Sequence, residues 1–71
     1  MTREEAFAEA KRRARELIDD DELALGVVVF IDVLAKAKID PPLHHADISH
    51  GVMLAAAGDG KAVREWVEKF G

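Results

Sequence analysis

Residues 23–35, LALGVVVFIDVLA, decide the fold, because twelve of these thirteen residues are apolar and only Asp32 is not. A run of this kind forms the core of a short chain whether it is a strand or a helix. Its β-branched residues favour a strand. However, the sequence contains no second β-rich run, and a lone strand would leave its backbone hydrogen-bonding groups unpaired.

A helix explains the residues on either side of this run. Lys36 and Lys38 stand at its end, where the helix dipole favours cations. The segment Asp40-Pro41-Pro42 follows, and proline removes a backbone donor and restricts the residue before it. We therefore predict a helix over about residues 21–38, with Asp20 or Asp21 as its N-cap.

Three further helices are predicted, over about residues 3–18, 47–57 and 60–70. Thr2 and Glu5 have the spacing of a capping box at the start of the first. Asp47 and Asp59 are candidate N-caps for the last two, and Gly58 is placed to end the helix before it. The expected fold is all-α, a compact four-helix mini-bundle with the second helix central, in a single domain of residues 1–71.

Length and composition limit the classes of protein that the chain can belong to. It has 71 residues, a net charge of -4 and no cysteine, so disulfides and thiolate metal sites are excluded. A domain this small buries only about 60% of its unfolded surface, so its stability is marginal. No apolar run reaches the roughly 18 residues of a membrane span, and no signal-peptide pattern opens the chain. We expect a cytoplasmic protein with no membrane partner.

Histidines and acids in and near residues 44–50 raise the question of a metal site. His44, Asp47 and His50 are spaced three apart, so on one helix they would spread over about 240°, which is poor geometry for a shared ion. His45 with His50 does no better. The acids at 19–22 do not follow the order of an EF-hand loop. We expect no metal and no cofactor, although the three histidines could give a weak pH response.

Motifs for catalysis are missing from the sequence. It contains no GxGxxG, Walker, HExxH or GxSxG pattern. Its one serine, Ser49, is followed directly by His50, and adjacent residues do not make a nucleophile and base. We therefore expect a protein that is not an enzyme.

The predicted bundle has more apolar surface than its core needs, and this surplus indicates a binding face. The candidate partner-binding residues are Leu25, Val28, Val29, Met53 and Leu54. A contiguous exposed apolar patch usually marks an interaction site. The expected function is protein binding, to a second copy in a homodimer or to another protein. The competing interpretation is a monomer whose short helices cover the second helix completely.

Two other functions are open at this stage. Residues 47–70 have the outline of a DNA-binding helix-turn-helix, with Lys61, Arg64 and Lys69 as candidate nucleic-acid contacts. Two glutamates dilute these cations, so nucleic acid is not the partner that we expect. The basic residues at 11–15 are interleaved with glutamates and are interpreted as a solvated face. The third possibility is an engineered binding protein built on a small natural helical scaffold.

Overall fold

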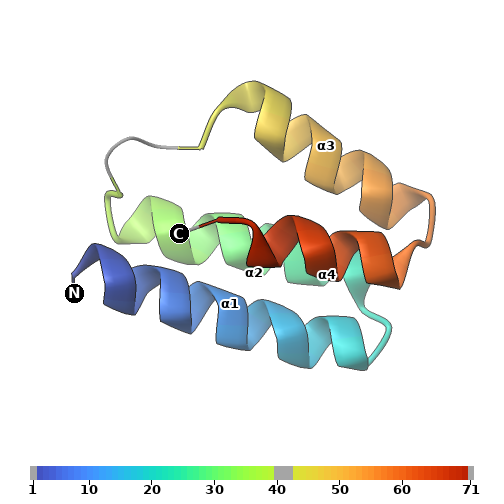
Figure 1. Cartoon of the computed structure of the whole chain (residues 1–71), viewed down its shortest axis with the longest axis horizontal. Helices are drawn as coiled ribbons and strands as arrows, with labels where there is room; N and C mark the ends of the chain where they lie inside the picture. Colours follow the sequence, from blue (N-terminus) through green and yellow to red (C-terminus); the bar gives the residue numbers. More distant parts are fainter. Residues whose placement is uncertain (1, 40–42, 71) are drawn as a thin grey trace.

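The computed structural model describes residues 2–39 and 43–70 and contains four helices and no strand within them. The helices are α1 (Arg3–Asp19), α2 (Leu23–Lys36), α3 (His45–Ala56) and α4 (Gly60–Glu68). The chain reverses direction between successive helices, and α3 crosses the top of the view (Figure 1). The predicted all-α four-helix mini-bundle is confirmed.

The core lies between three of the four helices. Its fully buried hydrophobic side chains come from α1, α2 and α4, and none of those in the described residues comes from α3. Both α2 and α4 pack against all three other helices. The prediction that the second helix is the central one is therefore not confirmed.

Three aromatic rings meet in and beside this core. The ring of Phe30 on α2 lies 5.4 Å from that of Trp66 on α4 and 5.6 Å from that of Phe70, measured between centroids. Trp66 and Phe70 meet edge to face at 5.1 Å. Such pairs add about 0.5–1.5 kcal/mol to the free energy gained by burial. The rings hold α2 against the C-terminal end of the chain.

Side chains cap two of the four helices at their first residues. Thr2 and Glu5 form the predicted capping box, and Asp59 accepts a hydrogen bond from the Ala62 amide at the start of α4. The other two N-cap predictions are wrong. Glu22 precedes α2 without a side-chain bond, and α3 begins at His45 with His44 as N-cap, so Asp47 lies in its first turn.

Three helices end in the same backbone motif, in which one residue takes a left-handed conformation. These residues are Asp21 after α1 (φ 62°), Lys38 after α2 (φ 54°) and Gly58 after α3 (φ 72°). In each, the next amide bonds back to a carbonyl in the last turn, as Glu22 does to Leu17 at 2.8 Å. Asp21 therefore closes α1 and does not cap α2.

The second and fourth helices are shorter than predicted. α2 starts at Leu23 because the residues before it close α1, and it ends at Lys36. Asp40-Pro41-Pro42 lies outside the described residues. α4 ends at Glu68, two residues before the predicted end. None of the described helices is long and apolar enough to cross a bilayer.

Candidate interaction surface

The exposed large hydrophobic side chains gather on two neighbouring helices. Within the described residues they are Leu25 and Val28 on α2, exposed by 48% and 57%, and Val52 and Met53 on α3, exposed by 50% and 68%. α2 and α3 pack against each other. We call these four residues the α2–α3 surface.

The predicted partner-binding residues divide into two groups in the structure. Leu25, Val28 and Met53 are exposed and belong to the α2–α3 surface. Val29 and Leu54 are half-buried, and Leu54 packs against the core. Val52 was not predicted, because the sequence pattern places it on the inner face of its helix together with Ile48 and Ala55.

Gly51 explains why Val52 points outward. It is buried, and a Cβ added there would lie 2.6 Å from the Trp66 ring. The indole therefore rests directly on the backbone of α3, and its Nε1–H donates to the Asp47 carbonyl at 3.0 Å. These contacts turn Gly51 toward the core. Val52, about 100° further round the helix, is left half exposed.

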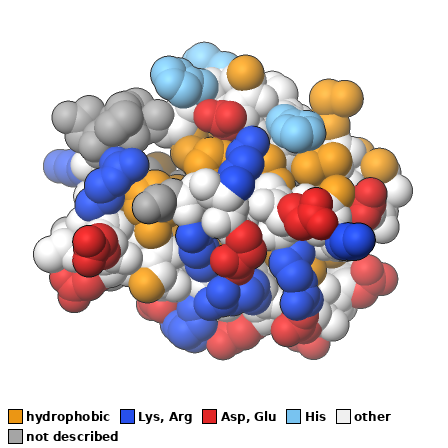
Figure 2. Space-filling model, in the orientation of Figure 1, with side chains coloured by type: hydrophobic (Ala, Val, Ile, Leu, Met, Phe, Trp, Pro, Cys, Tyr) orange, Lys and Arg blue, Asp and Glu red, His pale blue; other side chains and the backbone are white. Residues whose placement is uncertain are grey.

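Few charged groups lie on this side of the molecule. α3 contains no lysine, arginine or glutamate, and its one acid is Asp47. On α2, Asp32 and Lys36 neutralise each other through a 3.1 Å ion pair. Basic and acidic side chains crowd the lower half of the view over α1 and α4, whereas histidine and hydrophobic side chains lie over α3 (Figure 2). The surface is thus apolar and close to neutral.

A cavity of about 320 Å³ opens at one end of the α2–α3 contact. Ile31 and Ala35 of α2 and Ile48 of α3 are among its lining residues. Val28 precedes Ile31 by three positions, and Val52 follows Ile48 by four, so each shares a helix face with a lining residue. The cavity therefore lies beside the surface, further along both helices.

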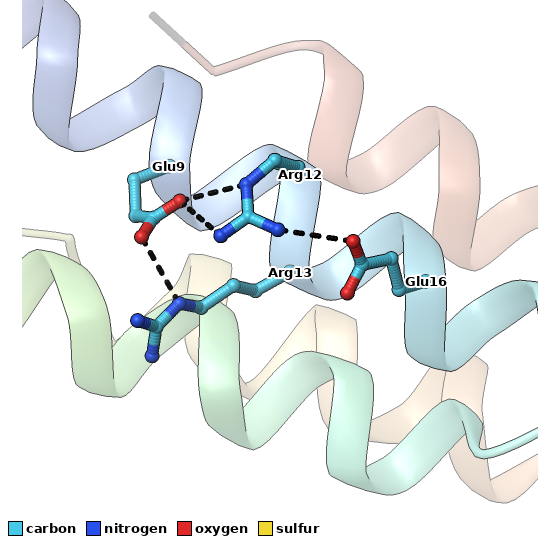
Figure 3. A network of polar contacts seen from close by, with 4 residues as sticks. All are labelled: Glu9, Arg12, Arg13 and Glu16. Atoms are coloured by element: carbon cyan, nitrogen blue, oxygen red, sulfur yellow. Dashed lines mark hydrogen bonds and ion pairs between the residues drawn. The ribbon is translucent and has the colours of Figure 1, made fainter.

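The arginines among the basic residues 11–15 of α1 form ion pairs with acids of the same chain. Glu9 accepts from Arg12 at 2.6 Å and from Arg13 at 3.2 Å, and Arg12 also bonds Glu16 at 3.0 Å (Figure 3). The hydrogen bond from Arg12 lowers the pKa of Glu9. Arg15 pairs with Glu68 of α4 at 2.8 Å. The cluster is a solvated, internally paired face, as the interleaved glutamates predict.

The candidate nucleic-acid residues are placed differently from one another. Arg64 pairs with Asp19 at the end of α1. The Lys69 ammonium lies 5.2 Å from the centre of the Phe70 ring. Lys61 is exposed in the first turn of α4. Of the three, Arg64 and Lys69 are thus already engaged within the chain.

The histidines lie around the start of α3, where His44, His45 and His50 are all exposed. Across residues 2–39 and 43–70, no three histidine or acidic side chains come together in a way that would hold a metal ion.

No protein-family model matches the chain, and neither the curated proteins nor the solved structures include a match to it.

Proposed function

We propose that this chain is a non-enzymatic protein-interaction module that associates with a second copy of itself through the α2–α3 surface. The observation that carries the proposal is the location of the exposed large hydrophobic residues. All four in the described part of the chain lie on α2 and α3, and α1 and α4 contribute none. Exposed apolar residues gathered in one patch are typical of interaction sites, whereas scattered ones are not.

The charge distribution favours a second copy as the partner. Two identical molecules of net charge -4 repel each other, and this repulsion is smallest when their contact surfaces are nearly neutral. The α2–α3 surface meets this condition, because Asp32, the acid of α2, is paired with Lys36 and α3 carries a single acid. A twofold contact here brings apolar residues together without setting like charges opposite one another.

The size of the domain supplies a second reason. A chain of this length gains little stability from its own core, and burying further apolar area against a copy stabilises it at about 25 cal/mol per Å². None of the core side chains in the described residues comes from α3. A dimer contact would cover the helix that the monomer covers least.

Sedimentation equilibrium between micromolar and millimolar concentrations tests the proposal. We expect a reversible monomer–dimer equilibrium that Val28→Asp and Met53→Asp each weaken at least tenfold, because a buried unpaired carboxylate is costly. Ala8→Asp is the matched control. It adds the same charge at an exposed position of α1 and leaves the dimer intact. A wild-type chain that stays monomeric at millimolar concentration refutes self-association.

A further inference from the structure

The cavity lies where α1 begins, α2 ends and α3 begins. Figure 1 shows these three helix ends at the left of the bundle. Phe7 of α1, Leu34 of α2 and Leu43 before α3 contribute to its walls. Lys38 is its one charged lining residue among those described, and the others are apolar. None of the four residues of the α2–α3 surface lines it, so it is a separate candidate site.

The end of α2 builds the rim of this cavity. The Ile39 amide donates to the Leu34 carbonyl at 3.4 Å, and the Lys38 amide donates to the Ala35 carbonyl at 3.1 Å. This motif turns the chain so that Ile39 comes back against the last turn of the helix, and both Ile39 and Leu34 line the cavity. It also satisfies two carbonyls that would otherwise repel an anion at this helix end.

Lys38 is an unusual residue for its place in the motif. Its φ of 54° is left-handed, a conformation that favours glycine and to a lesser degree asparagine or aspartate. Its exposed side chain forms no ion pair within the described residues. Lysine is thus found in a conformation that favours glycine, at the position that brings a cation to an apolar cavity. Strained residues of this kind cluster at binding sites.

We propose that the cavity binds a small monoanionic amphiphile, an apolar tail ending in a carboxylate that pairs with Lys38. The volume of about 320 Å³ lies within the range of small-molecule sites. A straight chain of roughly eight carbons with one carboxylate fits this volume, and an uncharged tail of the same length lacks the partner for Lys38.

Octanoate and octanol are matched probes, because they share the tail and differ in the head group. We would titrate each, below the concentrations at which they form aggregates, into the ¹⁵N-labelled full chain at pH 7 and follow the amide shifts. The expected result is saturable binding, with shifts concentrated at Ile31, Ala35, Ile39 and Ile48. Octanoate is expected to bind more tightly than octanol.

Three variants separate the charge from the cavity. Lys38→Gln should lower octanoate affinity by about three- to fivefold, the effect of one exposed ion pair, and leave octanol unchanged. Lys38→Gly should lower it equally while raising the melting temperature, because glycine suits the left-handed backbone. Ala35→Phe should weaken both probes by filling the cavity. Lys61→Gln and Ala8→Phe are the matched controls and should leave binding unchanged.

The result of Lys38→Gly cannot be attributed to unfolding, since that variant is expected to be the more stable protein. An octanoate-to-octanol affinity ratio that Lys38→Gln leaves unchanged would overturn the assigned role of the cation. Shifts spread over the whole chain, or an Ala35→Phe variant that binds both probes normally, would overturn the site. Because Val28→Asp leaves the cavity intact, it should bind octanoate like the wild type whether or not the chain dimerises.

Discussion

At the scale of single residues, the contact between Gly51 and Trp66 sets the orientation of α3. The indole is 2% exposed and lies where a side chain on residue 51 would have to be. Alanine is the better helix former by about 1 kcal/mol, so helix propensity alone predicts that Gly51→Ala stabilises the protein. The two effects oppose each other, and the ring contact is the larger.

We predict that Gly51→Ala lowers the free energy of unfolding by about 1–3 kcal/mol, the range for overpacking a closely packed contact. Urea denaturation followed by far-ultraviolet circular dichroism measures the change. Gly60→Ala is the matched control. A Cβ there meets only the Leu23 Cδ2 atom, at an ordinary 3.6 Å, so that variant should be neutral or slightly stabilised. Equal effects at the two glycines would show that propensity outweighs packing.

At the scale of helices, the ends are set by backbone conformation as much as by side chains. Gly58 has φ 72°, and nothing lies within 4 Å of a Cβ added there. Gly58→Ala therefore isolates the cost of a left-handed conformation. We expect it to lower the free energy of unfolding by about 1 kcal/mol in thermal denaturation. Asp21→Gly, at the equivalent position of α1, should shift the melting temperature in the opposite direction.

The start of α1 gives the protein a sensitivity to acid. The Thr2 amide donates to the Glu5 carboxylate at 3.0 Å, and this hydrogen bond lowers the pKa of Glu5. A carboxyl whose pKa is lowered on folding stabilises the fold above its unfolded-state pKa. That contribution is lost as the pH falls through the folded-state pKa.

Glu5→Gln removes this titration and keeps an oxygen that can accept the bond. We predict that the variant is less stable than the wild type at pH 7 and that the difference vanishes in acid, below the folded-state pKa of Glu5. Melting temperatures of both proteins between pH 7 and pH 2 test this. A difference that stays constant over that range would mean that the Glu5 charge does not contribute.

The four helices could be predicted from the sequence. Whether the acids at residues 19–22 end α1 or begin α2 could not. The pattern of apolar residues and the Thr2 and Asp59 caps have local causes that are visible in the sequence. The same acids can end one helix or begin the next, and the choice depends on the left-handed turn at Asp21. The start of α3 at His45 was missed because no N-cap side chain marks it.

The candidate surface was predicted only in part, because a contact between residues distant in the sequence decides which side chains are exposed. Leu25, Val28 and Met53 are exposed as a surplus of apolar residues suggests, although the binding role itself stays a prediction. Val52 was missed because a helical wheel ranks faces by their side chains and gives no weight to glycine. In this fold the face of α3 that carries Gly51 is the buried one, because the Trp66 side chain of α4 fills the space beside the glycine. That information lies in Trp66, fifteen residues away.

At the scale of the whole molecule, the fold is as compact as its length allows. Its radius of gyration is 11.0 Å, and a well-packed chain of this length has a radius of about 11 Å. The exposed residues of α2 and α3 therefore do not reflect an expanded fold. They follow from a core that α1, α2 and α4 share. α3 is held against this core mainly by its contact with Trp66 and by half-buried side chains.

The size of the core makes its central ring decisive. Phe30 is fully buried, and Phe30→Ala should lower the free energy of unfolding by about 3–5 kcal/mol. A domain of this length has roughly 4–10 kcal/mol in total, so the loss is a large fraction of the stability and the variant should melt at a markedly lower temperature. Circular dichroism at micromolar concentration measures this. Leu25→Ala, which truncates a side chain already 48% exposed, should cost less than about 1 kcal/mol.

The contact of Trp66 with the backbone of α3 also equips the protein with its own optical probe. It is the single tryptophan of the chain, and its environment depends on whether α3 is docked. Should α3 detach while the other helices persist, the indole would gain water and its fluorescence emission would move to longer wavelength before the helical signal falls. Partial opening of this molecule is therefore observable in unlabelled protein.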